Sequence, residues 1–413
     1  MGSLYTNRDS CRVCGGKELV DIIRFPDIPI ADALLEKNQL DQSEIKIPLT
    51  YVVCTDCFHS QIREDVLPEV LFSKDYPYYT GVSKALTKHF VSSAENLIKQ
   101  FKLNTLHKVI EIASNDGTML EVFHQAKCIT LGVDPATGPC QVATSRGLDI
   151  KNAFFDSALA ATINDEFGKA DLILGNNVLA HVPEPEDLVK GIAMLLSSEG
   201  HVVIEVPHLL TLISHVEFDT IFHQHYSYFS VHTAEMIFGK HGLYLNDVEQ
   251  VSIHGGSIRL FFSWEKGESE RLNALKKEET NAGLMEISIY RDFAKKVAGI
   301  TTDLRQLLTV LNQEGKTVVV YGAAGKANTL INVANIGMDD LKYIADLSQY
   351  KQGKYFTGVH LPIVSPSKIL EDMPDYVLIL AWNFKGEIMQ QLAEYHSKGG
   401  KFIIPIPEVK IIE

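Results

Sequence analysis

Short apolar runs alternate with helix-patterned segments through the middle of the chain. Apolar residues recur at helical spacing from Ser83 to Phe101, and the alternation then continues to about Trp264. Strands that alternate with helices form a parallel sheet with helices on both faces, so this pattern predicts an α/β domain. The runs expected to be strands are Lys108–Ile112, Ile129–Val133, Asp171–Leu174, His201–Glu205, Leu245–Val251 and Ile258–Ser263.

The last two of these runs have no helix between them. They flank His254-Gly255-Gly256-Ser257, whose composition is typical of a hairpin turn. We therefore expect the sheet to finish with an antiparallel pair.

A second α/β alternation follows a helical connector. The segment from Glu268 to Gly315 is charged and nearly free of glycine and proline, which predicts long helices. Beyond it, the turn Gly322-Ala323-Ala324-Gly325-Lys326 follows the first expected strand. The strands expected here are Thr317–Tyr321, Leu341–Ala345, Tyr376–Leu380 and Lys401–Ile404.

Two Cys-x-x-Cys pairs lie near the start of the chain, around short apolar runs such as Ile45–Val53, which predicts a small β-rich metal module. Four thiolates form the closed tetrahedral set that a structural Zn²⁺ favours, with no position left for a substrate. Two disulfides or four unrelated thiols are the alternatives, but a reducing cytosol disfavours disulfides. The expected zinc ligands are Cys11, Cys14, Cys54 and Cys57.

Length and composition fit a protein of three units. The 413 residues are 46% hydrophobic, and we place the units at 1–75, 76–266 and 267–413. The formal net charge of −14 argues against a nucleic-acid surface, which needs clustered Lys and Arg. No membrane-spanning stretch or leader is evident, so we expect a cytoplasmic protein. Cys128 and Cys140 lack metal-like spacing and are expected to be ordinary buried thiols.

Candidate binding residues lie at the carboxyl ends of the expected strands, where open α/β sheets hold their ligands. Glu111 lies near the end of the first strand, and Ala113, Asn115 and Gly117 follow at alternate positions of the turn. The turn lacks the full G-x-G-x-x-G of a dinucleotide site, which weakens a pyrophosphate interpretation.

The next two strand ends also carry polar groups. Asp134 can accept hydrogen bonds from both hydroxyls of a ribose. Asn176 and Asn177 can bind a polar amino-acid tail without placing a net charge in the cleft. An ordinary turn of an α/β sheet contains similar residues. None of these residues therefore indicates a nucleoside site alone, and only their combination does.

The order of these signals resembles the class I S-adenosylmethionine methyltransferases. With its flanking motifs, the chain resembles the zinc-containing nucleotide-sugar C-methyltransferases, the family of the C-3 methyltransferase of tetronitrose biosynthesis. The resemblance covers nearly the whole chain. It rests on the Cys-x-x-Cys pairs, Tyr76-Pro77-Tyr78-Tyr79, the Glu111 to Gly117 turn, Asn177 to His181, Phe218-Asp219, Gln224-His225, His254-Gly255-Gly256, Tyr321-Gly322-Ala323 with Lys326, Ala381-Trp382-Asn383 and Pro407-Glu408-Val409.

The resemblance implies a class I methyltransferase Rossmann-like domain between an N-terminal zinc module and a second, C-terminal Rossmann-like domain. Family members methylate a carbon of an NDP-4-keto-6-deoxyhexose, with C-3 favoured here. The cofactor S-adenosylmethionine is expected in the middle domain, and the nucleotide, of dTDP or GDP type, in the C-terminal one. We expect no obligatory protein partner.

Carried over by position, His225 matches the family's general base, and Tyr76 and His181 match positions around the sugar. The chain departs from relatives at Gln224, where some have glutamate, and at Ala113, where glycine is common. Phe222 likewise stands where some relatives have tyrosine.

Chemistry supports these roles. Removing a proton next to a ketone needs a positioned base and donors for the enolate oxygen, and histidine titrates near neutrality. A structural histidine remains the alternative for His225 and equally for His223, which could instead orient a neighbour or bind the sugar. His181 could donate to the 4-keto oxygen or simply end a turn, and Tyr76 could donate or pack.

The C-terminal turn predicts a phosphate site, because Gly322 and Gly325 allow close backbone approach and Lys326 adds a positive charge. An ordinary sheet rim is the alternative. The expected substrate-binding residues are His254, Lys326, Asn328, Asp346, Lys351, Trp382 and Asn383, while Phe154 and Phe155 could face the adenine of the cofactor or pack in the core.

Two other functions compete with a methyltransferase. The Tyr321 to Gly325 turn would suit an NAD-dependent sugar-nucleotide oxidoreductase, although the full glycine fingerprint is missing. A zinc protein that binds a nucleotide sugar without catalysis is the alternative outside enzymes.

Overall fold

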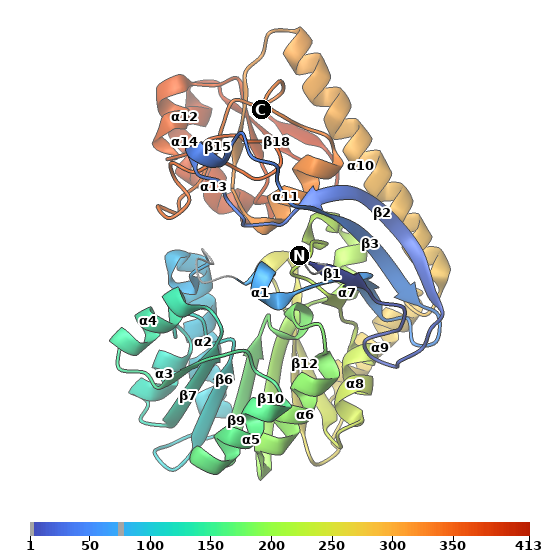
Figure 1. Cartoon of the computed structure of the whole chain (residues 1–413), viewed down its shortest axis with the longest axis vertical. Coiled ribbons are helices and arrows are strands. Elements are labelled where there is room, and N and C mark those ends of the chain that lie inside the picture. Colours follow the sequence, from blue (N-terminus) through green and yellow to red (C-terminus); the bar gives the residue numbers. More distant parts are fainter. Residues whose placement is uncertain (1–3, 73–77) are drawn as a thin grey trace.

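Two α/β units and an N-terminal β module meet around one central hollow. The computed structural model describes residues 4–72 and 78–413. Figure 1 shows the teal and green sheet with its helices below, the orange and red α/β unit above, and the blue N-terminal strands beside their junction. Within these described ranges, no helix combines the length and apolar character needed to cross a membrane.

The N-terminal module is a four-stranded antiparallel sheet, and its fourth strand comes from elsewhere in the chain. β2 (Leu19–Pro29), β3 (Lys46–Cys54) and β4 (Ser60–Ile62) pair in sequence order. β11 (Ser227–Tyr228), from the middle unit, then pairs with β4. The module also contains β1 (Tyr5–Asn7), which pairs with β5 (Glu64–Val66), the 3-10 helix η1 (Lys37–Gln39) and α1 (Pro68–Leu71).

The middle sheet has seven strands in the order β12-β13-β10-β9-β6-β7-β8. All six runs expected to be strands form strands, and the structure adds β8, which is only three residues long. β13 is antiparallel to both of its neighbours, so the predicted hairpin forms, with β13 between β12 and β10. The strands are β6 (Lys108–Ile112), β7 (Ile129–Asp134), β8 (Ile150–Asn152), β9 (Ala170–Asn176), β10 (Leu196–Pro207), β12 (Tyr244–Val251) and β13 (Ser257–Ser263).

Helices cover both faces of this sheet, because successive strand residues point to opposite sides. Val109 and Leu172 pack with α2 and α3 on one face. Ile110 and Ile173 lie in the cluster that α5, α6 and α8 cover on the other. The helices are α2 (Lys84–Gln100), α3 (Leu120–Gln125), α4 (Thr137–Ser145), α5 (Ser157–Glu166), α6 (Pro185–Leu195), α7 (Leu209–Ser214) and α8 (Val231–Gly239), with 3-10 helices η2 (Thr80–Val82), η3 (Leu179–His181), η4 (Phe218–Thr220) and η5 (Ile253–Gly255).

The charged connector forms the two long helices that its pattern predicts, α9 (Glu270–Asn281) and α10 (Ile287–Gln313). The buried residues of α10 recur every three or four positions from Tyr290 to Leu311. This stripe packs against both the N-terminal sheet and the C-terminal unit, and the rings of Tyr51 and Phe293 meet at 6.0 Å.

The C-terminal unit is a six-stranded sheet in the order β16-β15-β14-β17-β18-β19. The four expected strands form its parallel centre, and the two-residue β16 and the antiparallel β19 are additions. Its elements are β14 (Val318–Tyr321), α11 (Gly325–Val333), β15 (Ile344–Ala345), β16 (Ile363–Val364), α12 (Ser367–Asp372), β17 (Tyr376–Ile379), η6 (Trp382–Phe384), α13 (Lys385–Gln391), α14 (Ala393–Ser397), β18 (Lys401–Ile404) and β19 (Lys410–Ile412).

The division into 1–75, 76–266 and 267–413 remains our proposal for the units. β11 shows that the first two exchange backbone hydrogen bonds, so the metal module and the middle unit are tied together directly as well as through the chain.

Candidate active site

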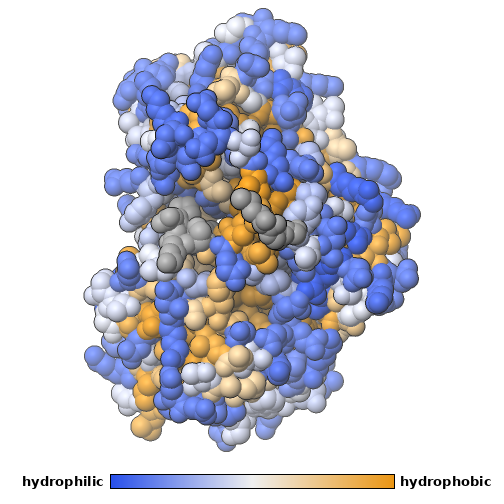
Figure 2. All heavy atoms as spheres, viewed as in Figure 1, coloured by the Kyte–Doolittle hydropathy of each residue, from blue (hydrophilic) through white to orange (hydrophobic). Residues whose placement is uncertain are grey.

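A cavity of about 690 Å³ lies where the three units meet, and residues of all three line it. The carboxyl ends of the middle strands form one side, and the first turn of the C-terminal unit forms another. Figure 2 shows apolar atoms gathered at this mid-height level, between the two α/β units.

The turn after β6 has the backbone that its sequence pattern suggested. Ala113, Asn115 and Gly117 all adopt positive φ, at 59°, 48° and 76°. A Cβ on Gly117 would lie 2.4 Å from a methyl of Leu148 and 3.1 Å from the Cβ of Ala143, so a side chain there would need these neighbours to move, and the positive φ also favours glycine. Alternate left-handed residues fold the chain back sharply, which brings its backbone to the cavity wall.

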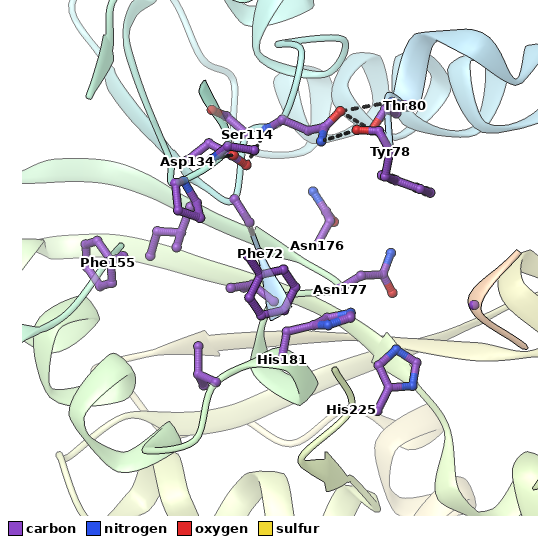
Figure 3. Close-up of a pocket in the computed structure, with 18 of the residues that line it drawn as sticks. Phe72, Tyr78, Thr80, Ser114, Asp134, Phe155, Asn176, Asn177, His181 and His225 are labelled. Atoms are coloured by element: carbon purple, nitrogen blue, oxygen red, sulfur yellow. Dashed lines mark hydrogen bonds between the residues drawn. The ribbon is translucent and has the colours of Figure 1, made fainter. Parts of the chain in front are cut away.

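The side chain of Asn115 holds this turn against the segment that begins at Tyr78. Its Oδ1 accepts hydrogen bonds from the Thr80 amide at 2.9 Å and from the Thr80 hydroxyl at 3.2 Å, and its Nδ2 donates to the Tyr78 carbonyl at 3.1 Å. Figure 3 shows these bonds beside Ser114. Asn115 lines the cavity while it also shapes the wall.

Two buried carboxyl groups make this end of the cavity acidic. Burial is the main cause that raises the pKa of Glu111 to about 8; a hydrogen bond from Asn176 opposes the rise, and the charges of Asp116 and Asp134 contribute to it. Burial also raises the pKa of Asp134 to about 6, although the amides of Asn115 and Ala136 donate to its two oxygens at 2.9 and 2.8 Å. Oε2 of Glu111 has no hydrogen-bond partner among the described residues.

Four more residues expected at the cofactor line the cavity, namely Phe154, Phe155, Asn176 and Asn177, whereas Gly117 does not. Asn177 has a left-handed backbone, and its buried Oδ1 is without a partner in the part of the chain that the structure describes. Asn176 donates to the Met119 sulfur at 3.1 Å. Phe155 packs against the core while Phe154 is exposed, so the two neighbours face different surroundings.

His225 and His181 lie together in the wall of the same cavity. Their ring centroids are 4.5 Å apart, edge to face, and Figure 3 shows both rings near Asn177. Nδ1 of His225 donates to the Thr220 carbonyl at 2.7 Å, which leaves Nε2 as the lone-pair nitrogen. Burial, and then the neighbouring His181, hold the pKa of His225 well below its usual value, so the ring is neutral at pH 7.

His181 is neutral as well, because burial lowers its pKa to about 4. A hydrogen bond to the backbone of Gln224 engages the ring, whereas its buried Nδ1 has no partner within residues 4–72 and 78–413. In a neutral imidazole the free nitrogen is then an acceptor. The expected donation to a keto oxygen stays a prediction, and a free Nδ1 can instead accept a hydrogen bond from a sugar hydroxyl.

The C-terminal unit brings the two lysines that line the cavity in the described chain. Lys326 donates to the His254 carbonyl at 2.9 Å and lies 4.8 Å from the Trp382 ring centre. Lys351 donates to the Ala323 carbonyl at 2.7 Å and pairs with Asp32 at 3.1 Å. His254 and Asn383 line the same region.

Three expected site residues instead hold backbone carbonyl groups at the end of β2, just after it, and near the start of β3. His223 bonds the Pro48 carbonyl at 3.0 Å, Gln224 donates to the Ala31 carbonyl at 2.8 Å, and Asn328 donates to the Pro29 carbonyl at 2.8 Å. All three are buried and do not line the cavity. A carbonyl group shielded from water needs a hydrogen-bond partner, and the sequence does not reveal that these three carbonyl groups pack against His223, Gln224 and Asn328.

Asp346 and Trp382 also lie behind the wall. The oxygens of Asp346 accept from the amides of Ala323 and Ser348 at 2.7 and 2.8 Å, which shapes the turn after β14. Nε1 of Trp382 donates to buried Asp219 at 2.7 Å. Tyr76 lies outside the described residues.

The structure adds two site features that sequence patterns do not show. Asp32, with a φ of 61°, reaches the cavity from the N-terminal module and pairs with Lys351. The Thr220 carbonyl that orients His225 is a backbone group, so no residue type marks it. The sequence signal for this region is the occurrence of two motifs close together, Phe218-Asp219 and Gln224-His225.

The four cysteines form the cluster that their spacing predicts. Their sulfur atoms all lie within 4.8 Å of one another, with Cys11 and Cys57 3.5 Å apart and Cys14 and Cys54 3.6 Å apart. Zn–S bonds of about 2.3 Å give a tetrahedral edge of about 3.8 Å, so the cluster fits zinc. Disulfides would need sulfurs about 2 Å apart. Cys128 and Cys140 are buried, as expected.

The cavity also fits S-adenosylmethionine. Glu111 Oε2, Ser114 Oγ and Asn177 Oδ1 are buried along the strand ends without partners among the described residues. Unpaired buried polar atoms are costly, so such a group calls for a polar ligand. A cationic cofactor matches this acidic end.

Family models and one full-length relative match the chain. The models describe a zinc binding domain at residues 11–72, a methyltransferase domain at 86–248 and a C-methyltransferase C-terminal domain at 252–407. The C-methyltransferase NovU of Streptomyces niveus is 35% identical over 407 residues, which is 98% of this chain and 97% of the relative. A ubiquinone biosynthesis O-methyltransferase of Vibrio campbellii is 25% identical over 23% of this chain and 41% of its own length.

Solved methyltransferase structures resemble part of the chain at low scores. Magnesium protoporphyrin IX methyltransferase from Synechocystis PCC 6803 with bound SAM has a TM-score of 0.33 and 15% identity, over 43% of this chain and 78% of that one. A SAM-dependent methyltransferase from Thermotoga maritima has a TM-score of 0.36 and 14% identity, over 48% and 98%.

Near-complete coverage by one relative, together with three domain matches in the predicted order, decides between the competing functions. An oxidoreductase and a non-catalytic binding protein are excluded as interpretations. The chain belongs to the C-methyltransferase family: it is an S-adenosylmethionine-dependent C-methyltransferase with a class I Rossmann-like fold and a four-cysteine zinc site.

Proposed function

We propose that the enzyme methylates C-3 of an NDP-4-keto-6-deoxyhexose in deoxysugar biosynthesis, with His225 as the general base. The observation that carries this proposal is the fixed tautomer of His225. Its Nδ1 proton is held by the Thr220 carbonyl, so Nε2 presents a lone pair in the wall of a cavity shared with the cofactor turn.

The distribution of charge supports a nucleotide sugar that enters from the C-terminal unit. Among the described lining residues, the lysines are Lys326 and Lys351, both from that unit. Buried Glu111 and Asp134 lie at the opposite, cofactor end. A diphosphate favours the cationic end and a sulfonium the acidic end, so the sugar carbon and the methyl group would meet between them, beside the two histidines.

His225 then removes the C-3 proton, which the neighbouring 4-keto group acidifies, and the carbon gains the electron pair of the broken C–H bond. S-adenosylmethionine supplies the electrophilic methyl group on its sulfonium. Closely packed rings exclude water around the base: the Phe222 centroid lies 4.1 Å from that of His225, and Phe72 lies 5.9 Å from His181. His181 accepts a hydrogen bond from a sugar hydroxyl through Nδ1.

The substrate is tested by incubating the protein with methyl-labelled S-adenosylmethionine and a panel of dTDP- and GDP-linked 4-keto-6-deoxyhexoses. We expect transfer to one of them, with the new methyl carbon coupled to C-3 in the NMR spectrum of the product. A methyl group on oxygen, or on another carbon, would contradict the assignment.

The base is tested separately from methyl transfer. With S-adenosylhomocysteine in D2O, the wild type should exchange the C-3 proton of the substrate, and His225→Asn should lose this exchange at least a hundredfold, the usual scale of general base catalysis. His232→Asn, a half-buried histidine outside the cavity, is the matched control and should exchange normally. Normal exchange by His225→Asn would remove His225 from the base role.

A further inference from the structure

The segments that carry both cavity histidines are anchored on the zinc module. His225 is followed at once by Tyr226 and then by β11, which pairs with β4 of that module. The Tyr226 amide donates to the Ala180 carbonyl at 2.8 Å, next to His181, and its own carbonyl accepts from the Ile62 amide at 3.1 Å. The position of each histidine therefore depends on β4 and Tyr226.

The first Cys-x-x-Cys pair, Cys11–Cys14, forms a loop that we call the metal knuckle. One of its side chains contacts both of the segments that carry the cavity histidines. Arg12 lies inside Cys11-Arg12-Val13-Cys14, and its side chain is fully buried. Its Nη1 donates to the Pro183 carbonyl at 2.7 Å, two residues after His181. Its guanidinium lies over the ring of Tyr226, 5.1 Å from the centroid, next to His225.

The other contacts of Arg12 fix it to the zinc module itself. Nη2 donates to the Ile62 carbonyl at 3.3 Å and pairs with Asp65. The Arg12 amide donates to Gln61 at 2.8 Å. The amides of Val13 and Cys14 meanwhile lie 3.4 and 3.5 Å from the Cys11 sulfur, so the backbone that carries Arg12 is the backbone that wraps the metal site.

We infer that Arg12 is a positioning residue for the histidine pair, and that the zinc site acts on the reaction through it. A planar guanidinium can bond the Pro183 carbonyl, bond the module and stack on Tyr226 at the same time, whereas an ammonium cannot. The metal fixes the knuckle, the knuckle fixes Arg12, and Arg12 holds the His181 segment against the His225 segment. Zinc thereby contributes to turnover beyond keeping the module folded.

The cofactor end lies outside this network. Glu111 and the turn after β6 make none of these contacts, so loss of the Arg12 contacts should leave cofactor binding intact. Cofactor binding therefore distinguishes a positioning role from general destabilisation of the fold, which would weaken cofactor binding as well as turnover. The inference rests on the proposed role of His225.

The test compares Arg12→Met, Arg12→Lys and the matched control Arg24→Met. Arg24 belongs to the same module, but its side chain is 79% exposed and bonds only Asp21 at 2.6 and 2.9 Å among the described contacts. Bound zinc, the dissociation constant for S-adenosylmethionine, kcat and C-3 proton exchange are measured for each variant.

We expect Arg12→Met to keep its zinc and to bind S-adenosylmethionine within about twofold of wild type, while kcat and C-3 exchange both fall at least tenfold. Arg12→Lys should have kcat and C-3 exchange rates between those of Arg12→Met and the wild type. Arg24→Met should match the wild type in both. Guanidinium ion added to Arg12→Met should restore part of the exchange rate.

Each other outcome has a definite meaning. Normal kcat in Arg12→Met, while His225→Asn remains inactive, overturns the positioning role and leaves the proposed base intact. Normal exchange in His225→Asn overturns the proposed function instead. Loss of zinc or of folding in both Arg12 variants assigns the residue to folding alone and also overturns the inference.

Discussion

Cofactor binding should release a proton from Glu111. The folded protein raises the pKa of this buried carboxyl from 4.5 to about 8, mainly by desolvation. At pH 7, about nine tenths of the Glu111 side chains are therefore protonated before the cofactor arrives. S-adenosylmethionine brings a sulfonium and an ammonium group, and a nearby positive charge favours the ionised carboxylate.

The expected number of protons released follows from the protonated fraction of Glu111. Binding at pH 7 should release up to about 0.9 proton, because the ionised form dominates in the complex. The dissociation constant should tighten about tenfold between pH 7 and pH 9, which corresponds to about 1.4 kcal/mol, as the carboxyl no longer has to lose its proton. Asp134, with a pKa of about 6, is mostly ionised already and adds little over this range.

Titration calorimetry measures the release directly. The observed binding enthalpy at pH 7 should differ between phosphate and Tris buffers in proportion to their ionisation enthalpies. Glu111→Gln keeps the size of the side chain but has no proton to lose, so its enthalpy should be the same in both buffers.

The pH dependence of the free energy of unfolding is a second test of the direction of the Glu111 pKa shift. A folded pKa above the unfolded value means that ionisation costs stability as pH rises from about 4.5 through about 8. Glu111→Gln should therefore lose less stability than wild type between pH 7 and pH 9. A buffer-independent enthalpy in the wild type, with an unchanged dissociation constant up to pH 9, would refute the reasoning.

Three further predictions concern the metal, the base and the cofactor turn. Cys14→Ser should abolish zinc binding in metal analysis, whereas Cys128→Ser should retain it; retention by both would contradict the four-cysteine site. Because burial lowers the pKa of His225, kcat should stay constant down to pH 6.5 and fall only below it, and an acid limb above pH 6.5 would mean that His225 is not the titrating base. Ala113→Gly removes left-handed backbone strain of about 1–2 kcal/mol. The thermal unfolding midpoint of this variant should therefore exceed that of Ala136→Gly, because Ala136 has an unstrained φ of −79°. Equal midpoints would show that Ala113 is not strained.

The fold was largely predictable because its signals are local. Period-two and helical apolar patterns mark the main strands of both α/β units and the helices of the connector, and the Cys-x-x-Cys spacing places two ligands of each pair near one ion. Among the elements that escaped prediction, β8, β11, β16 and β19 have two or three residues each, too few to show a period. β11 exists only because β4 offers a free edge, which is a long-range pairing.

The candidate site was predictable only in part, for a related reason. Glu111, Asp134 and Asn177 line the cavity because they lie at the carboxyl ends of parallel strands, and these ends must share one edge of the sheet. His223, Gln224 and Asn328 are as polar, but the tertiary structure uses them to satisfy carbonyl groups of β2, of the residues just after it and of β3. Nothing local separates these two uses of a polar side chain.

The sequence by itself determined the class of protein: the set of four paired cysteines, the alternating sheets and the order of motifs identify a zinc-containing, S-adenosylmethionine-dependent C-methyltransferase. The tertiary structure alone decided which nitrogen of His225 is free, that Asp32 reaches Lys351, and that Arg12 joins the metal knuckle to both histidine segments. Periodicity and ligand spacing are properties of neighbouring residues, whereas these contacts join residues up to 319 positions apart and depend on how separate units pack.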